Sequence, residues 1–109
     1  MSLPDGLDLI GLDEMTEATA TVVRAGQHTL VLVRKNDKAF AYINNCPHQN
    51  RPLSLPSGKV IVSEDTYIVC PFHGASFDMT SGQCRGGPAG SSVLQAVPVK
   101  VIDNRVIVA

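Results

Sequence analysis

Two short motifs, each of which combines one cysteine with one histidine, constrain this chain more than any other feature. The first motif is Cys46-Pro47-His48, and the second is Cys70-Pro71-Phe72-His73. Thiolate and imidazole groups bind Zn²⁺ or iron–sulfur centres, whereas hard cations such as Ca²⁺ prefer oxygen ligands. The fold must therefore bring two loops together so that their ligands meet at one metal centre. The four candidate ligands are Cys46, His48, Cys70 and His73.

Length and composition indicate one small globular domain. The chain has 109 residues, 44% of them hydrophobic, and a formal net charge of −1. This length suits one core rather than two, and the lack of a basic run argues against nucleic-acid binding. We see neither a signal peptide nor an apolar run long enough to span a bilayer, so we expect a soluble, cytoplasmic protein. Three cysteines in such a chain favour metal binding over a disulfide framework.

Short Thr- and Val-rich segments separated by turn residues predict an all-β fold. Such segments, with Gly, Pro, Asn and Asp between them, are typical of strands joined by tight turns. We find no convincing helix, and we expect an irregular lead-in over residues 1–15 and a glycine- and proline-rich loop over residues 85–90. The expected strands are 16–24, 29–34, 39–43, 59–62, 66–69, 75–78, 97–102 and 105–108.

The order of ligands within each motif bears on the kind of metal centre. Zinc sites of this composition usually pair cysteine with cysteine and histidine with histidine at short spacings. Here each motif mixes the two residue types. A binuclear cluster accounts for this order, because each loop then supplies one ligand to each of two irons. A mononuclear zinc site stays open as the simpler alternative.

Together the two motifs resemble the paired cluster loops of the Rieske [2Fe–2S] family. The resemblance continues after His73 through residues 74–78, Ser81-Gly82 and residues 87–89, and it covers nearly the whole chain. It implies one Rieske-type [2Fe–2S] cluster, with both cysteines on one iron and both histidines on the other. It also implies a Rieske-like fold, in which an antiparallel β base from both chain ends carries a small inserted cluster-binding subdomain.

This fold divides the chain at two points. We expect a single domain over residues 1–109, with a basal subdomain of residues 1–43 and 88–109 and a cluster-binding subdomain of residues 44–87. The segment between the two motifs is longer than is usual in the family. Because loop lengthening costs little entropy, we expect the extra residues within 53–58 or at the turn 63–65.

The residues beside the ligands predict a low reduction potential. Histidine ligation raises the potential of a [2Fe–2S] centre, and neighbouring groups then tune it. High-potential members of the family carry an extra cysteine in each motif, which together form a disulfide, and they place Ser and Tyr hydroxyls against the cluster sulfurs. The matching positions here are Arg51, Phe72, Ala75 and Phe77. None supplies such a group, so we expect a potential at or below about 0 mV.

The sequence predicts an electron carrier rather than an enzyme. A Rieske cluster has no open coordination position, and one further histidine, His28, is too little for an oxygen-activating iron site. No Gly-x-Gly-x-x-Gly fingerprint indicates a nicotinamide or flavin domain. The resemblance implies a soluble, monomeric ferredoxin that passes electrons from a flavin-dependent reductase to the oxygenase component of an aromatic-ring dioxygenase system. Its transient docking surface would comprise Pro47, Gln49, Asn50, Pro71, Phe72 and residues 86–89.

Two other functions stay open at this stage. One is the small subunit of an assimilatory nitrite reductase, which shares the fold but often lacks the ligands, and the other is a structural zinc module. Colour separates the zinc module from the rest, because only a cluster is brown and reducible. Cys84 lies outside both motifs, and we expect it to be a small residue packed near the cluster-binding subdomain.

Overall fold

The fold is nearly all β, as predicted. The computed structural model describes residues 6–46, 51–71, 74–86 and 92–109. The described strands are β1 (Asp8–Gly11), β2 (Ala20–Ala25), β3 (His28–Lys35), β4 (Lys38–Ile43), β5 (Ile61–Ser63), β6 (Tyr67–Val69), β7 (Ser76–Asp78), β8 (Cys84–Gly86), β9 (Ala96–Val97), β10 (Val99–Ile102) and β11 (Arg105–Val108). A short 3-10 helix, η1 (Leu12–Glu14), follows β1. Within these ranges, no helix is long and apolar enough to cross a bilayer.

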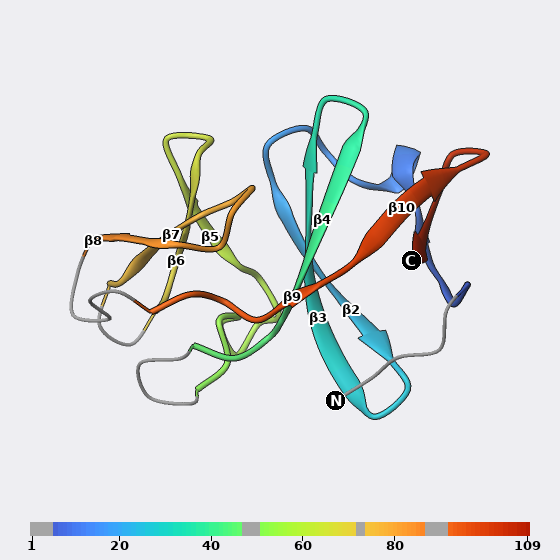
Figure 1. Ribbon diagram of the computed structural model, residues 1–109. Helices are drawn as coiled ribbons and strands as arrows, with labels where there is room; N and C mark the ends of the chain where they lie inside the picture. Colours follow the sequence, from blue (N-terminus) through green and yellow to red (C-terminus); the bar gives the residue numbers. More distant parts are fainter. Residues whose placement is uncertain (1–5, 47–50, 72–73, 87–91) are drawn as a thin grey trace.

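The strands form three antiparallel sheets. One has the order β1-β11-β10, the second β2-β3-β4-β9, and the third β5-β6-β7-β8. Figure 1 shows the second sheet in the centre, with the β5–β8 sheet on one side and β10 on the other. The third sheet contains both strands that flank the second cysteine motif, so it positions Cys70, whereas Cys46 follows β4 of the second sheet.

Strand β3 is the centre of the molecule. Its four residues from Leu30 to Val33 are all 0% exposed. Because side chains alternate along a strand, Val31 and Val33 pack into the core beside the β5–β8 sheet, whereas Leu30 and Leu32 pack into a second core beside β1, β10 and β11. Burial on both faces explains why this strand is a continuous apolar run rather than an alternating one.

Two tight hairpin turns were predicted correctly. Residues 64–66 connect β5 to β6, and Asp103 and Asn104 connect β10 to β11. Glu64, Asp65, Asp103 and Asn104 all have positive φ, between 50° and 64°. The two-residue turn between β10 and β11 matches the twist of the strands that it joins.

The segment between the two motifs contains a separate small hairpin. Ser54 and Val60 form a β-bridge, and the Leu55 N–H donates to the Lys59 carbonyl at 2.7 Å. Residues 54–60 therefore fold back on themselves before β5 begins, and the position of the extra residues within 53–58 or 63–65 stays a prediction.

Several strands differ from the expected ones because distant partners decide them. Strand β1 lies in the predicted irregular lead-in and pairs with β11, nearly a chain length away. Strand β8 lies partly in the predicted loop and pairs with β7 through a bulge. Pro98 divides the expected strand 97–102 into β9 and β10, since proline has no N–H for a continuous ladder. The subdomain division at residues 43/44 and 87/88 stays a prediction; Val93 bridges Gln83, which puts this segment beside β8.

Candidate metal centre

Cys46 lies just after β4, at the base of a loop that backbone and side-chain hydrogen bonds close. The Cys46 N–H donates to the carbonyl of Arg51 at 2.6 Å. Asn44 stabilises the same loop through two hydrogen bonds. Its Oδ1 accepts from the N–H of Leu53 at 2.7 Å, and its Nδ2 donates to Ser54 Oγ at 3.0 Å. Asn44 was not among the predicted site residues, because no local pattern indicates that it contacts residues nine and ten positions away.

Cys70 lies at the end of β6, in the connection to β7. Its N–H donates to the Ala75 carbonyl at 2.8 Å, and its own carbonyl accepts from the Gly74 N–H at 2.9 Å. Gly74 has a φ of 75°, a left-handed conformation that residues with a Cβ rarely adopt. The second loop is thus closed at its base by the β6–β7 ladder and by these two hydrogen bonds.

The two cysteines share one core. Cys46 is 1% exposed and Cys70 is 3% exposed, and both belong to the cluster of buried residues that includes Leu53, Ile68 and Phe77. Neither forms a disulfide. Buried thiols at the bases of two neighbouring loops suit thiolate ligation of iron, which keeps the sulfurs away from water and oxidants. The donor set therefore fits a [2Fe–2S] cluster as far as the described residues define it.

The two histidine candidates, His48 and His73, lie outside the described residues, as does Phe72. Within the described ranges, no three His, Cys, Asp or Glu side chains gather at a metal-binding distance. The ligand role of the four residues stays a prediction.

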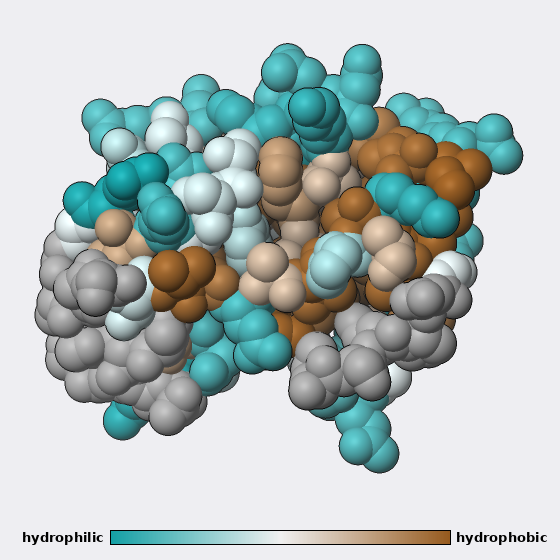
Figure 2. Space-filling view, viewed as in Figure 1, coloured by the Kyte–Doolittle hydropathy of each residue, from teal (hydrophilic) through white to brown (hydrophobic). Residues whose placement is uncertain are grey.

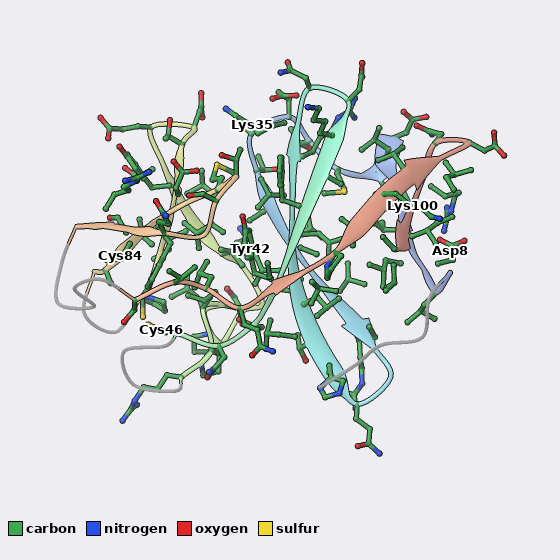
Figure 3. All side chains as sticks on the ribbon, in the orientation of Figure 1. Asp8, Lys35, Tyr42, Cys46, Cys84 and Lys100 are labelled. Carbon is green, nitrogen blue, oxygen red and sulfur yellow. The ribbon has the colours of Figure 1, made fainter. Side chains whose placement is uncertain are left out.

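Cys84 lies on β8, opposite Phe77 of β7. It is partly buried and packs against the core that holds Cys46 and Cys70. Its Sγ donates to the Gly86 carbonyl at 3.3 Å. The predicted packing role is therefore confirmed. Figure 3 shows Cys46 and Cys84 in the same part of the molecule as the β5–β8 sheet, with Asp8 and Lys100 on the opposite side.

Tyr42 links the central sheet to the candidate centre. It is 2% exposed, and its hydroxyl donates to the Met79 carbonyl at 2.9 Å, across from β4 to the turn after β7. Burial, and secondarily the negative charge of Asp78, raise the pKa of Tyr42 to about 12. The ring also packs against Gly82, where an added Cβ would lie 2.9 Å from Tyr42 Cε1. No local pattern in the sequence predicts this contact, because the hydrogen bond joins residues 37 positions apart.

The two positions expected to lack hydroxyl groups are part of the buried core. Ala75 and Phe77 are both 0% exposed. The Ala75 carbonyl also accepts the hydrogen bond from the Cys70 N–H, so the backbone of Ala75 lies next to that of the second cysteine. A methyl group and a phenyl ring at these positions provide no hydrogen-bond donor to a buried centre.

Two surface cavities are lined by described residues away from the cysteines. One of about 260 Å³ is lined by β4, β9 and the residues Thr80 and Ser81, and another of about 300 Å³ lies between the Asp37 turn and β10. Neither is lined by a cysteine.

Comparison with known protein families gives the class of the chain. The model of the Rieske [2Fe-2S] domain matches residues 7–103. The chain belongs to the Rieske [2Fe–2S] domain family, and it accordingly carries one [2Fe–2S] cluster of the Rieske type.

Two curated relatives narrow the class further. The ferredoxin component of the alkene monooxygenase system of Xanthobacter autotrophicus is 30% identical over 102 residues, which cover 94% of this chain and 79% of that protein. The ferredoxin subunit of anthranilate 1,2-dioxygenase from Burkholderia cepacia is 31% identical over 95 residues, covering 87% of this chain and 82% of that protein. Both are electron-transfer components rather than catalytic units, and the chain is of this kind.

Solved structures agree with this fold. A chain in the complex of reduced oxygenase and oxidized ferredoxin in carbazole 1,9a-dioxygenase is 27% identical, with a TM-score of 0.77 and coverage of 94% of this chain and 91% of that one. A structure named for the small subunit of a nitrite reductase is 20% identical, with a TM-score of 0.70 and coverage of 97% and 99%. At that identity the second likeness shows the shared fold alone.

Proposed function

We propose that this chain is the ferredoxin of an oxygenase system, which accepts one electron at a time on its Rieske cluster and passes it to a terminal oxygenase. The observation that carries the proposal is the pair of buried thiols, Cys46 and Cys70, in two closed loops of a chain that belongs to the Rieske family. The bound cluster supplies the redox chemistry. The protein supplies thiolates and imidazoles, excludes water from the sulfurs and presents one edge to partners.

The proposed ligands are Cys46 and Cys70 for one iron and His48 and His73 for the other. Nitrogen couplings in the electron–nuclear double resonance spectrum of the dithionite-reduced protein test the histidines directly. We expect them in the wild type, and we expect His48→Ala and His73→Ala to lose the native cluster spectrum. Cys84→Ser is the matched control and should keep it. A native spectrum in either histidine variant would contradict the ligand assignment.

We further propose a low reduction potential, because Ala75 and Phe77 offer no donor to the cluster sulfurs. Restoring one hydroxyl with Ala75→Ser should raise the midpoint. A charge-assisted hydrogen bond of about 1.5 kcal/mol that forms only to the reduced cluster corresponds to about 60 mV for one electron. Ala41→Ser introduces the same hydroxyl at a buried position in the other core and should leave the midpoint unchanged. A wild-type midpoint above about +150 mV by voltammetry would overturn the proposal.

The partner proteins complete the proposal. The electron donor would be a flavin-dependent reductase, and the acceptor would be the oxygenase of the same system. The carrier would be a monomer in the cytoplasm. Its basal and cluster-binding subdomains would have the boundaries expected from the sequence. Reconstitution tests it: with a purified reductase, its nicotinamide and an oxygenase, turnover should require this chain. The nitrite reductase alternative is weaker, because the likeness to such a subunit extends only to the fold.

A further inference from the structure

The cluster-bearing part of the chain carries most of its cations and carboxylates at different ends, although Arg85 and Asp78 are close enough for their charges to interact. Residues 44–94 contain six charged side chains, and all six lie within the described residues. Three are cations and three are carboxylates. The cations are Arg51, Lys59 and Arg85, and the carboxylates are Glu64, Asp65 and Asp78.

The carboxylates lie at the end of the β5–β8 sheet away from Cys70. Glu64 and Asp65 form the turn between β5 and β6, and Asp78 pairs with Tyr67 at the start of β6. Asp65 and Cys70 are five positions apart, which corresponds to at most roughly 16 Å of extended chain. Figure 2 shows hydrophilic residues along the upper edge of the molecule, above the hairpin turns seen in Figure 1.

Other parts of the protein partly neutralise this acidic end. Lys35 of β3 donates through Nζ to the Asp65 carbonyl at 2.9 Å, which brings a cation against the turn. Burial alone would raise the pKa of Asp78, but hydrogen bonds from Thr80 and Ser81, together with the charge of Arg85, hold this pKa below its ordinary value. Asp78 is thus engaged within its own turn and does not offer a free carboxylate to a partner.

The cations lie at the opposite end, beside the cysteine loops. Lys59 comes two residues before Ile61, which pairs with Val69 next to Cys70. Arg85 precedes Gly86, which pairs with Ser76, the residue after Ala75. Both are exposed, and within the described ranges neither takes part in a salt bridge, although the charge of Arg85 also acts on Asp78. Arg51 is exposed as well, and its backbone carbonyl accepts the hydrogen bond that closes the first loop.

We propose that Lys59 and Arg85, with Arg51, form a cationic rim around the cluster end and that the rim docks a partner protein whose electron-transfer site is surrounded by Asp and Glu carboxylates. This inference rests on the proposed function. The Debye length is about 10 Å at 0.1 M salt. A partner at the cluster end therefore responds to the nearby cations, whereas Glu64 and Asp65 in the far turn are largely screened and Asp78 is engaged within its own turn. The formal net charge of −1 has the opposite sign to the rim. The rim and the whole-molecule charge therefore predict opposite salt dependences for the reaction with an anionic partner.

Binding of a redox-inert trianion, hexacyanochromate(III), tests the rim without any electron transfer. In ¹⁵N-labelled protein, the paramagnetic anion should broaden amide signals around Lys59 and Arg85. It should broaden those around Lys38 and Lys100 much less, since these exposed lysines lie on β4 and β10 of the other sheets. Equal broadening at all four positions, or none at Lys59 and Arg85, would refute the rim.

Oxidation of the dithionite-reduced cluster tests the effect of the cationic rim on electron transfer. The reduced cluster loses one electron, and one Co(III) complex gains it to become Co(II). With the anionic oxidant [Co(edta)]⁻ the wild-type rate should fall as salt is added, and with the cationic [Co(phen)₃]³⁺ it should rise. Lys59→Glu and Arg85→Glu should each slow the anionic reaction about threefold at low ionic strength, whereas Lys38→Glu and Lys100→Glu, with the same change in net charge, should not.

The outcomes separate this inference from the proposed function. A protein without a reducible cluster refutes the proposed function. A protein that has the cluster and transfers electrons, but whose Lys59 and Arg85 variants react like the Lys38 and Lys100 controls, refutes only the cationic rim.

Discussion

Removing the Tyr42 hydroxyl tests whether the central sheet and the cluster end are locked together by one buried hydrogen bond. The Tyr42 hydroxyl donates to the Met79 carbonyl at 2.9 Å, and both residues are nearly inaccessible to solvent. Tyr42→Phe leaves the ring in place but removes the donor to the buried Met79 carbonyl. The loss should lower the free energy of unfolding by about 1 to 3 kcal/mol. For a domain near this size, each kcal/mol lowers the melting temperature by roughly 4–8 °C.

The measurement is the midpoint of thermal unfolding, followed by circular dichroism at one fixed scan rate because release of a cluster makes unfolding irreversible. Tyr67→Phe is the matched control. It removes the same atom from a half-buried residue of β6 whose hydroxyl has no hydrogen-bond partner among the described residues. We expect the Tyr42 variant to melt at least about 4 °C below the control. Equal midpoints for the two variants would refute the locking role of Tyr42.

Three further predictions concern the same region. Gly82→Ala should lower the melting temperature more than Gly26→Ala, because both glycines have positive φ but only the Cβ at Gly82 would strike Tyr42; similar losses would contradict the steric argument. Since the unfolded chain loses the Tyr42 proton near pH 10 and the folded chain near pH 12, the contribution of Tyr42 protonation to the free energy of unfolding, at most about 3 kcal/mol, is present below pH 10 and lost towards pH 12. Melting curves of wild type and Tyr42→Phe should therefore converge over that range. Asn44→Ala should release the cluster faster on dilution into chelator than Asn44→Asp, which keeps the acceptor oxygen that closes the first loop; equal release rates would exclude this role.

The local features of the fold were predictable from the sequence. Turn residues and short apolar segments located β3, β4, β6 and the two tight hairpins closely, because strand and turn propensities act over a few residues. The two cysteines were found by their spacing from histidine, which is also a short-range signal. The Rieske resemblance then supplied the fold class and the cluster, both of which the family match confirms.

Features decided by distant partners could not be predicted in this way. Strand β1 exists because β11 pairs with it, and β8 exists because β7 and the segment around Val93 lie on its two sides. Asn44 and Tyr42 act through hydrogen bonds to residues 9 and 37 positions away. A single sequence records that these side chains can donate or accept, but it does not record which chain segment will lie next to them.

The position of β3 has a consequence for how the cluster end holds its shape. Val31 and Val33 of β3 and Tyr42 of β4 belong to the same buried cluster as Cys46 and Cys70. The core beneath the cysteine loops is therefore built partly from the central sheet, and the β5–β8 sheet alone would leave it open on one side. A segment this short also buries too little apolar surface to be stable by itself. The cluster end is thus an extension of the central sheet's core, so a substitution on β3 or β4 can loosen the cysteine loops without touching either cysteine.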